Sequence, residues 1–328
     1  MAWPRRGRRG GLHVVAVAVV IGCSPGSPTA TALPPGTTAP TEAAGDSPLP
    51  TAAPTRAVVP LRLDETLALA DGREIKARCV GEGTPTILLE AGGSNDMTDW
   101  APQFVNALGE VTTTCLYSRA GGPGSSPPAA RPPTMASVTS DAFEVLELAR
   151  SEAGVEGPYL FVGWSLGGSV ALANALTRPD QTVGIAILDT DFPGDFLAIC
   201  ADQGRTEEDC QAEFDQDIDA KFMEAEIARA VNPLDLPAVL VTAMEYPDCQ
   251  EAPGATLSAS VGGTIVVAAD CAGLAAAVAD RQIAAWGAAL PEIDQVRVAA
   301  NHDGLVDSEG RQIADLILDI VEAARAPS

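Results

Sequence analysis

The sequence predicts an α/β domain with a mainly parallel sheet, and three observations support this fold class. Short apolar runs recur along the chain, and we expect strands at 86–91, 112–118, 159–164, 183–189, 238–243 and 295–300. Several of these runs are apolar throughout, which is typical of strands covered by helices on both faces. Helical patterns separate the runs, and this alternation indicates parallel strands joined by helices.

The flanking segments complete the predicted sheet and its helices. Segments 61–69 and 74–81 also have strand character, so eight strands are expected. The last helix should be amphipathic, because its apolar residues recur at helical spacing: Ile313, Leu316, Ile317, Ile320 and Val321. Residues 192–235 are acidic and helix-prone and interrupt the alternation. We expect them to form a small helical cap over the carboxyl ends of the strands, where ligands bind in open α/β sheets.

The first 60 residues differ from the rest of the chain. A basic stretch precedes the apolar run "LHVVAVAVVIG", which is shorter than the roughly 20 residues that a spanning helix needs, so 1–22 is interpreted as a signal peptide. The run ends in "VIGC", which resembles a bacterial lipobox and implies lipidation of Cys23. Residues 23–60, rich in Pro, Thr and Ala, are expected to form a disordered tether. The chain is therefore predicted to be exported and anchored to the outer face of the cell membrane, with plain secretion as the alternative.

The charge of the chain limits its partners. The formal net charge is −24, and lysine occurs only at Lys76 and Lys221. A surface of this sign disfavours nucleic acid and anionic membrane surfaces. A small-molecule substrate is expected instead, while the sequence leaves the oligomeric state open.

The cysteines indicate disulfide bonds. Apart from Cys23, six cysteines remain, an even number that allows 15 pairings. Sequence proximity suggests Cys200–Cys210 and Cys249–Cys271, which leaves Cys79–Cys115 between two predicted strands. A metal site is the alternative, but the sequence contains no CxxC pair and no histidine cluster. Disulfides are the expected state in an exported chain, and neither a metal nor another cofactor is expected.

One motif in the sequence is typical of a serine nucleophile. Residues 163–167, Gly-Trp-Ser-Leu-Gly, satisfy G-x-S-x-G and lie between an apolar run and a helical pattern, which is the context this motif requires. Small residues are needed because a sharp turn brings backbone segments close together. The following helix N-terminus offers free N–H groups and a positive dipole end to a developing oxyanion. The alternative is an ordinary glycine turn.

A serine nucleophile needs a general base, which is most often histidine. The chain contains two histidines, and His13 falls in the predicted signal peptide. His302 follows the last predicted strand and lies downstream of Ser165, in the chain order serine, acid, histidine. We therefore expect His302 to be the base, against the alternative of a loop histidine without a catalytic role.

Five segments in this order, "CVGEGTPTILLEAGG", "CLYSRAGGPGSS", "YLFVGWSLGG", "GIAILD" and "NHDG", resemble those of α/β-hydrolase fold serine hydrolases. The resemblance covers about residues 61–325. It implies the α/β-hydrolase fold, Ser165 as nucleophile and His302 as base. It also implies an oxyanion hole formed by the backbone N–H groups of Leu166 and Gly93.

Several carboxylates compete for the role of the acid that orients His302. Asp189 ends the run "GIAILD", a position that carries the acid in some proteins of this family, and Asp191 is a near neighbour. After the next strand, Glu245 and Asp248 are alternatives. We choose Asp189.

These expectations combine into one predicted function. The chain is expected to be a serine hydrolase that cleaves a carboxylic ester through an acyl-enzyme on Ser165, with Trp164 as a candidate for lining the substrate pocket. An amidase or aminopeptidase using the same residues is one alternative. A non-catalytic binding protein on a hydrolase frame is the other.

Overall fold

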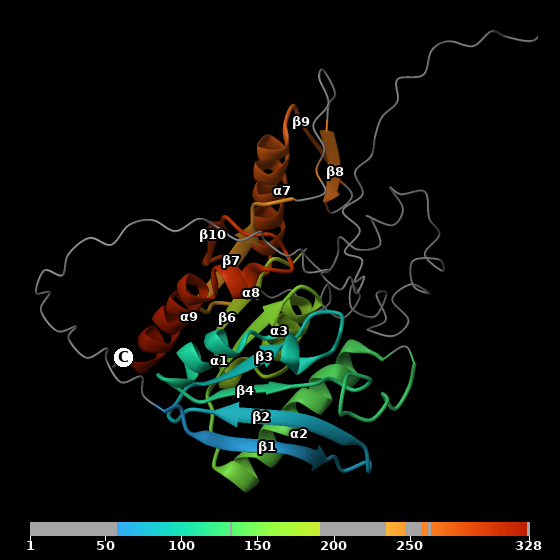
Figure 1. Cartoon of the computed structure of the whole chain (residues 1–328), viewed down its shortest axis with the longest axis vertical. Helices are drawn as coiled ribbons and strands as arrows, with labels where there is room; N and C mark the ends of the chain where they lie inside the picture. The colour runs from blue at the N-terminus through green and yellow to red at the C-terminus, as the bar shows by residue number, and fades with distance from the viewer. Residues whose placement is uncertain are drawn as a thin grey trace, which may run out of the picture. The chain divides into compact units, whose positions relative to one another are not determined.

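The structure is a computed structural model, and it describes residues 58–131, 133–190, 234–246, 249, 257–261 and 264–326. An eight-stranded sheet with the order β1-β2-β4-β3-β5-β6-β7-β10 forms the centre of this part of the chain (Figure 1). Its strands are β1 (Leu61–Ala68), β2 (Glu74–Val80), β3 (Thr86–Glu90), β4 (Thr114–Tyr117), β5 (Tyr159–Trp164), β6 (Thr182–Leu188), β7 (Ala238–Ala243) and β10 (Ile293–Val298).

The sheet is mainly parallel, as the sequence predicts. Strand β2 pairs antiparallel with β1 and with β4, and the other neighbouring strands pair in parallel. Parallel neighbours need a crossover connection, and the helical segments between the strands provide several of these connections.

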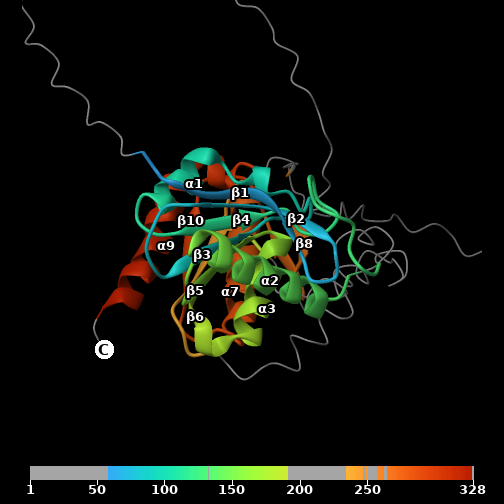
Figure 2. The same cartoon turned by 90° about the horizontal axis from the view of Figure 1, so that it is seen from below.

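Helices cover both faces of the sheet (Figure 2). Successive residues of the central strands pack against these two different helical layers. On β3, Leu88 packs in one cluster with residues of α2 (Met135–Ala153) and α3 (Leu166–Thr177). Its neighbours Ile87 and Leu89 pack in a second cluster with α1 (Pro102–Gly109) and α9 (Gly310–Arg325). All three side chains are fully buried. Both faces of the strand therefore need apolar side chains, which explains the uninterrupted apolar runs.

The remaining helices lie mostly in the C-terminal half of the chain. They are α7 (Cys271–Trp286), the short α8 (Leu305–Ser308) and the 3-10 turns η1 (Met97–Asp99) and η2 (Pro179–Gln181). Helix α9 has the predicted apolar stripe: Ile313, Ile317, Ile320 and Val321 are buried, and Leu316 is partly buried against the same cluster.

The bounds of several strands differ from the sequence expectation by one or two residues, and two differences concern the C-terminal part of the chain. Strand β10 is Ile293–Val298 rather than 295–300, because the chain leaves the sheet after Val298 and the next residues form the loop that carries His302. A second, two-stranded sheet is formed by β8 (Leu257–Val261) and β9 (Thr264–Ala268), which pair antiparallel. The sequence analysis missed this hairpin, although two short β-prone runs separated by Gly-Gly are its ordinary signal.

Two of the three expected disulfides lie in the described part of the chain, and both are present. Cys79 and Cys115 are directly opposite each other on β2 and β4 and are bonded to each other. Cys249 is bonded to Cys271, the first residue of α7. The pair Cys200–Cys210 lies outside the described residues, as do nearly all of the expected cap, the expected signal peptide and Cys23.

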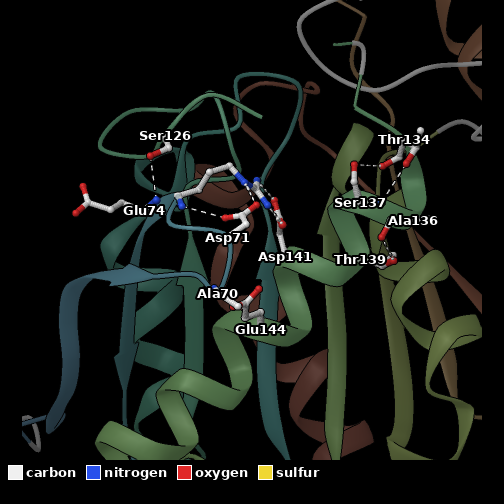
Figure 3. A network of polar contacts seen from close by, with 11 residues as sticks. Ala70, Asp71, Glu74, Ser126, Thr134, Ala136, Ser137, Thr139, Asp141 and Glu144 are labelled. Atoms are coloured by element: carbon white, nitrogen blue, oxygen red, sulfur yellow. Dashed lines mark hydrogen bonds and ion pairs between the residues drawn. The ribbon is translucent and has the colours of Figure 1, made fainter. Parts of the chain in front are cut away.

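A polar network ties the β1–β2 turn to α2 (Figure 3). The guanidinium of Arg73 donates one hydrogen bond to each carboxylate oxygen of Asp141, both at 2.6 Å, and its Nε donates to Asp71 at 2.6 Å. Such a bidentate pair fixes the direction of the arginine side chain.

Among the described helices, none is both long enough and apolar enough to cross a membrane.

Candidate active site

Ser165 lies at a sharp turn between β5 and α3, as its motif predicts. Its backbone has φ 54° and ψ −130°, a conformation with positive φ that residues other than glycine rarely adopt. The Ser165 N–H donates to the Leu188 carbonyl at 3.0 Å, and the Ser165 carbonyl accepts from the Gly168 N–H at 2.9 Å. The surrounding structure thus holds a strained residue in place, which is common at functional sites.

The glycines around Ser165 are required because backbone segments meet at this turn. A Cβ atom on Gly163 would lie 2.0 Å from the Gly167 carbonyl oxygen, and one on Gly167 would lie 2.0 Å from the Glu90 carbonyl oxygen. A Cβ atom on Gly168 would lie 2.3 Å from Oγ1 of Thr190. Steric exclusion therefore accounts for the small residues of the motif.

Asp189 and His302 form a hydrogen-bonded pair at the carboxyl ends of the strands. Asp189 directly follows β6, and His302 lies in the loop after β10. Oδ2 of Asp189 is 2.7 Å from Nδ1 of His302, and Oδ1 of Asp189 accepts from the Ala243 N–H at 3.0 Å. The two side chains are 13% and 21% exposed. The carboxylate is thus held at both oxygens, and one of them can fix the tautomer of the imidazole.

The other candidate acids do not make this contact in the described part of the chain. The Glu245 side chain is exposed, and its backbone N–H donates to the Ala300 carbonyl at 2.9 Å. Asp191 and Asp248 lie outside the described residues. The contact expected between Asp189 and His302 is therefore present, whereas Glu245 is turned towards solvent.

Trp164 connects the turn of Ser165 with the loop of His302. Its indole N–H donates to the His302 carbonyl at 3.2 Å, and the centroids of the two rings are 5.3 Å apart. The sequence analysis considered Trp164 only as a pocket-lining residue and missed this link. Since Trp164 immediately precedes Ser165, the link brings the histidine loop close to the serine.

Thr190 is another residue that the sequence analysis missed. Its hydroxyl donates to the Ser165 carbonyl at 2.7 Å, and its own carbonyl accepts from the indole N–H of Trp286 at 2.8 Å. Trp286 is fully buried at the end of α7. These bonds hold the backbone of the Ser165 turn. No local sequence pattern predicts them.

One expected oxyanion-hole residue, Leu166, follows Ser165 directly, and the other, Gly93, lies in the loop after β3. Leu166 is the first residue of α3, where a backbone N–H has no partner within the helix. Gly93 is half-buried in the loop after β3. That loop is close to the serine, because a Cβ atom built on Gly92 would lie 3.5 Å from Cβ of Ser165.

A buried polar cluster lies beneath the loop after β3. Glu90 is fully buried and accepts hydrogen bonds from Asn174 Nδ2 at 2.8 Å and from the Tyr117 hydroxyl at 3.0 Å. Nη1 of Arg119 is 3.7 Å from Glu90 Oε2. Burial raises the pKa of the Glu90 carboxyl, and the Arg119 charge and these hydrogen bonds oppose that rise. Burial also raises the pKa of Tyr117 well above its usual value.

Metal ligands are not grouped in the part of the chain that the structure describes. Among those residues, no cluster of three or more histidine, cysteine, aspartate or glutamate side chains could hold a metal ion.

No protein-family model and no curated protein matches the chain. Solved structures do. An epoxide hydrolase from Vigna radiata is 12% identical, with a TM-score of 0.53, and the match covers 81% of this chain and 98% of that one. The mouse alpha/beta hydrolase domain-containing protein 10 is 17% identical, with a TM-score of 0.51 and coverages of 82% and 100%.

A third solved structure is the 2-hydroxy-6-oxo-6-phenylhexa-2,4-dienoate hydrolase of a Rhodococcus strain. It is 14% identical, with a TM-score of 0.50, and the match covers 80% of this chain and 100% of that one. At identities this low, the matches show that the proteins are similar in fold. Together with the mainly parallel eight-stranded sheet, the comparisons show that this chain has the α/β-hydrolase fold.

Proposed function

We propose that the chain is a serine hydrolase that cleaves a carboxylic ester through an acyl-enzyme on Ser165. The observation that carries the proposal is the 2.7 Å contact between Asp189 Oδ2 and His302 Nδ1, next to a serine held at positive φ. A carboxylate, an imidazole and a hydroxyl in this order form the machinery of acyl transfer.

Acylation follows from these groups. Nε2 of His302 takes the proton from the Ser165 hydroxyl as Oγ attacks the acyl carbon of the substrate. The negative charge on the carbonyl oxygen is stabilised by the N–H groups of Leu166 and Gly93. The protonated imidazole, stabilised by Asp189, then gives its proton to the leaving alkoxide, which departs as an alcohol.

Deacylation repeats these steps with water. His302 takes a proton from a water molecule, and the resulting hydroxide attacks the acyl carbon. The second tetrahedral intermediate collapses, the acid is released, and the proton returns to Ser165 Oγ. The balance is one ester and one water consumed, and one acid and one alcohol formed.

A fluorophosphonate probe tests the nucleophile directly. Ser165 Oγ should form a bond to phosphorus and expel fluoride, so the wild-type protein should be labelled and Ser165→Ala should not. Folding of the variant is checked by its melting temperature. A wild-type protein that is not labelled would favour the binding-protein alternative, and labelling of Ser165→Ala would assign the nucleophile elsewhere.

The ester and amide alternatives are separated by turnover. Hydrolysis of p-nitrophenyl esters of increasing acyl length, compared with the matching p-nitroanilides, reports both the bond cleaved and the size of the acyl pocket. We expect the esters to be cleaved. Turnover of the anilides with comparable kcat/KM would support an amidase instead.

We also propose that the protein is exported and anchored through a lipid on Cys23, because this cysteine directly follows a short apolar run that ends in Val-Ile-Gly. A Cys23→Ser variant should lose the lipid and leave the membrane fraction. If that variant still sediments with membranes and still carries lipid, the anchor lies elsewhere.

A further inference from the structure

The guanidinium of Arg119 contacts the loop after β3, the loop that carries Gly93. Nη1 donates to the Ala91 carbonyl at 2.6 Å, Nη2 donates to the Gly92 carbonyl, and Nε donates to Asn95 Oδ1 at 2.8 Å. The Arg119 residue is only 3% exposed. One buried side chain therefore holds three points of a five-residue loop.

The contact with Gly92 determines the direction of a neighbouring donor. The Gly92 carbonyl and the Gly93 N–H belong to the same planar trans peptide unit and point in opposite directions. The Gly92 carbonyl accepts from Arg119 and also from the Asn95 N–H at 3.2 Å. The Gly93 N–H must therefore point away from the guanidinium.

This peptide unit needs an external constraint. It joins two glycines, Gly92 and Gly93, and glycine populates both signs of φ at little cost. Asn95, at the far end of the loop, has φ 60°, and its side-chain oxygen accepts a hydrogen bond from the Nε–H of Arg119. Without the guanidinium, the Gly92 carbonyl keeps the 3.2 Å bond from the Asn95 N–H but loses its charged donor. The peptide between the two glycines can then rotate more freely, and the direction of the Gly93 N–H is less well fixed.

Charge compensation of Glu90 is the competing explanation for Arg119. The distances favour the loop, because Nη1 is 3.7 Å from Glu90 Oε2 but 2.6 Å from the Ala91 carbonyl oxygen. Glu90 also has its own hydrogen-bond donors in Tyr117 and Asn174. A point charge would satisfy Glu90, whereas the loop contacts need the planar fork of a guanidinium.

We propose that Arg119 is a positioning residue that aims the Gly93 N–H at the oxyanion of the transition state; this rests on the proposed function of the site. The role predicts a specific kinetic signature. A donor that acts on the transition state contributes to kcat and not to ground-state binding. Loss of such a donor typically lowers turnover by about 10²–10³-fold.

The experiment compares Arg119→Lys with a matched control, Arg73→Lys. Lysine keeps the positive charge near Glu90 but cannot form three hydrogen bonds in one plane. Arg73 is a part-buried arginine with a bidentate carboxylate partner, Asp141, and its side-chain hydrogen bonds go to Asp71 and Asp141 rather than to the loop. We expect Arg119→Lys to lower kcat on a p-nitrophenyl ester by at least about tenfold with KM little changed, and Arg73→Lys to keep the wild-type kcat.

Two further readouts separate a positioning role from a structural one. A trifluoromethyl ketone, whose hemiketal oxyanion would occupy the same hole, should lose affinity for Arg119→Lys in parallel with kcat. The double variant Arg119→Met/Glu90→Gln removes both charges, so it should recover stability relative to Arg119→Met but not kcat. Recovery of kcat in the double variant, or wild-type kcat in Arg119→Lys, would show that Arg119 only neutralises Glu90.

A crystal structure of Arg119→Lys tests the inference independently of turnover. The peptide between Gly92 and Gly93 should be rotated or present in two orientations. A peptide unchanged from the wild type would overturn the positioning role, even in an active enzyme. A rotated peptide in a protein that hydrolyses no ester would instead leave the positioning role intact and count against the proposed function.

Discussion

Both oxygens of the Asp189 carboxylate are used, because Oδ2 lies 2.7 Å from Nδ1 of His302 while Oδ1 accepts a hydrogen bond from the Ala243 N–H. The second bond joins the end of β6 to the end of β7, so the direction of the carboxylate is set by the sheet itself. The orientation of His302 is thus tied to the central sheet.

Asp189→Asn should lower kcat by orders of magnitude, up to about 10⁴-fold, with little change in melting temperature. Asparagine retains an oxygen for the Ala243 N–H but cannot stabilise the imidazolium, and it favours the wrong tautomer of His302. Glu245→Gln is the matched control and should remain active, since its side chain is exposed. Wild-type turnover in Asp189→Asn, or a collapse of turnover in Glu245→Gln, would contradict this assignment.

Gly163→Ala should destabilise the fold strongly, because its Cβ would lie 2.0 Å from the Gly167 carbonyl oxygen. Overpacking of this kind costs about 1–3 kcal/mol or more, and here the obstacle is backbone that cannot move without displacing Ser165. Gly310→Ala is the control, because a Cβ atom there would meet Phe104 at an ordinary 3.6 Å. Melting temperatures check the pair, and equal values for the two variants would contradict the steric origin of the motif.

The strands of the large sheet, the sharp turn at Ser165 and the position of His302 after the last strand could be predicted from sequence because each leaves a local signal. Buried strands require apolar runs, and the turn at Ser165 requires glycines at fixed spacing. The sequence limited the candidates for the acid that orients His302 to a few carboxylates, because each of them follows a predicted strand. The choice among them depends on which side chain reaches His302, and that is a matter of three-dimensional distance.

The contacts of Thr190, Trp164 and Arg119 were not predictable for a related reason. Each joins residues 25 or more positions apart, as the bonds from Thr190 to Ser165, from Trp164 to His302 and from Arg119 to Gly92 show. Hydrogen bonds between residues so far apart in the sequence produce no periodicity and no motif. The β8–β9 hairpin is different, since its local signal existed and was overlooked.

Trp164→Phe should lower kcat by about tenfold while the protein stays folded. Phenylalanine keeps the ring beside His302 but lacks the N–H that donates to the His302 carbonyl at 3.2 Å, so the histidine loop loses one of its anchors. A misplacement of about 1 Å in a catalytic group can cost up to about 10²-fold. The measurement is kcat with a saturating ester, and an unchanged kcat would show that the hydrogen bond from Trp164 is not needed to hold His302.

Alkylation of the unreduced protein should find no free thiol at Cys79, Cys115, Cys249 or Cys271, and intact mass checks this result. We expect the same for Cys200 and Cys210. Replacement of Cys79 and Cys115 together by alanine should cost about 3–4 kcal/mol, since the crosslink closes a loop with a sequence separation of 36. An adduct on any of the four described cysteines would contradict the pairing.

Glu90 gives the chain a specific pH dependence, whose sign follows from the raised pKa of its carboxyl. In the unfolded chain this group ionises near its usual value of 4.5, whereas burial keeps the proton on it to higher pH in the folded chain. The folded state therefore binds more protons within that window, and the stability contributed by Glu90 is lost as the pH rises from 4.5 through the raised pKa.

The Glu90→Gln variant serves as the reference, because glutamine at position 90 does not titrate. The melting temperature of the wild type, minus that of Glu90→Gln, should therefore decrease as the pH is raised from about 4 to 8, whatever the constant offset from the altered contacts with Arg119 and Tyr117. A difference that grows with pH would mean that Arg119 and the hydrogen bonds outweigh burial, and that the folded protein favours the carboxylate.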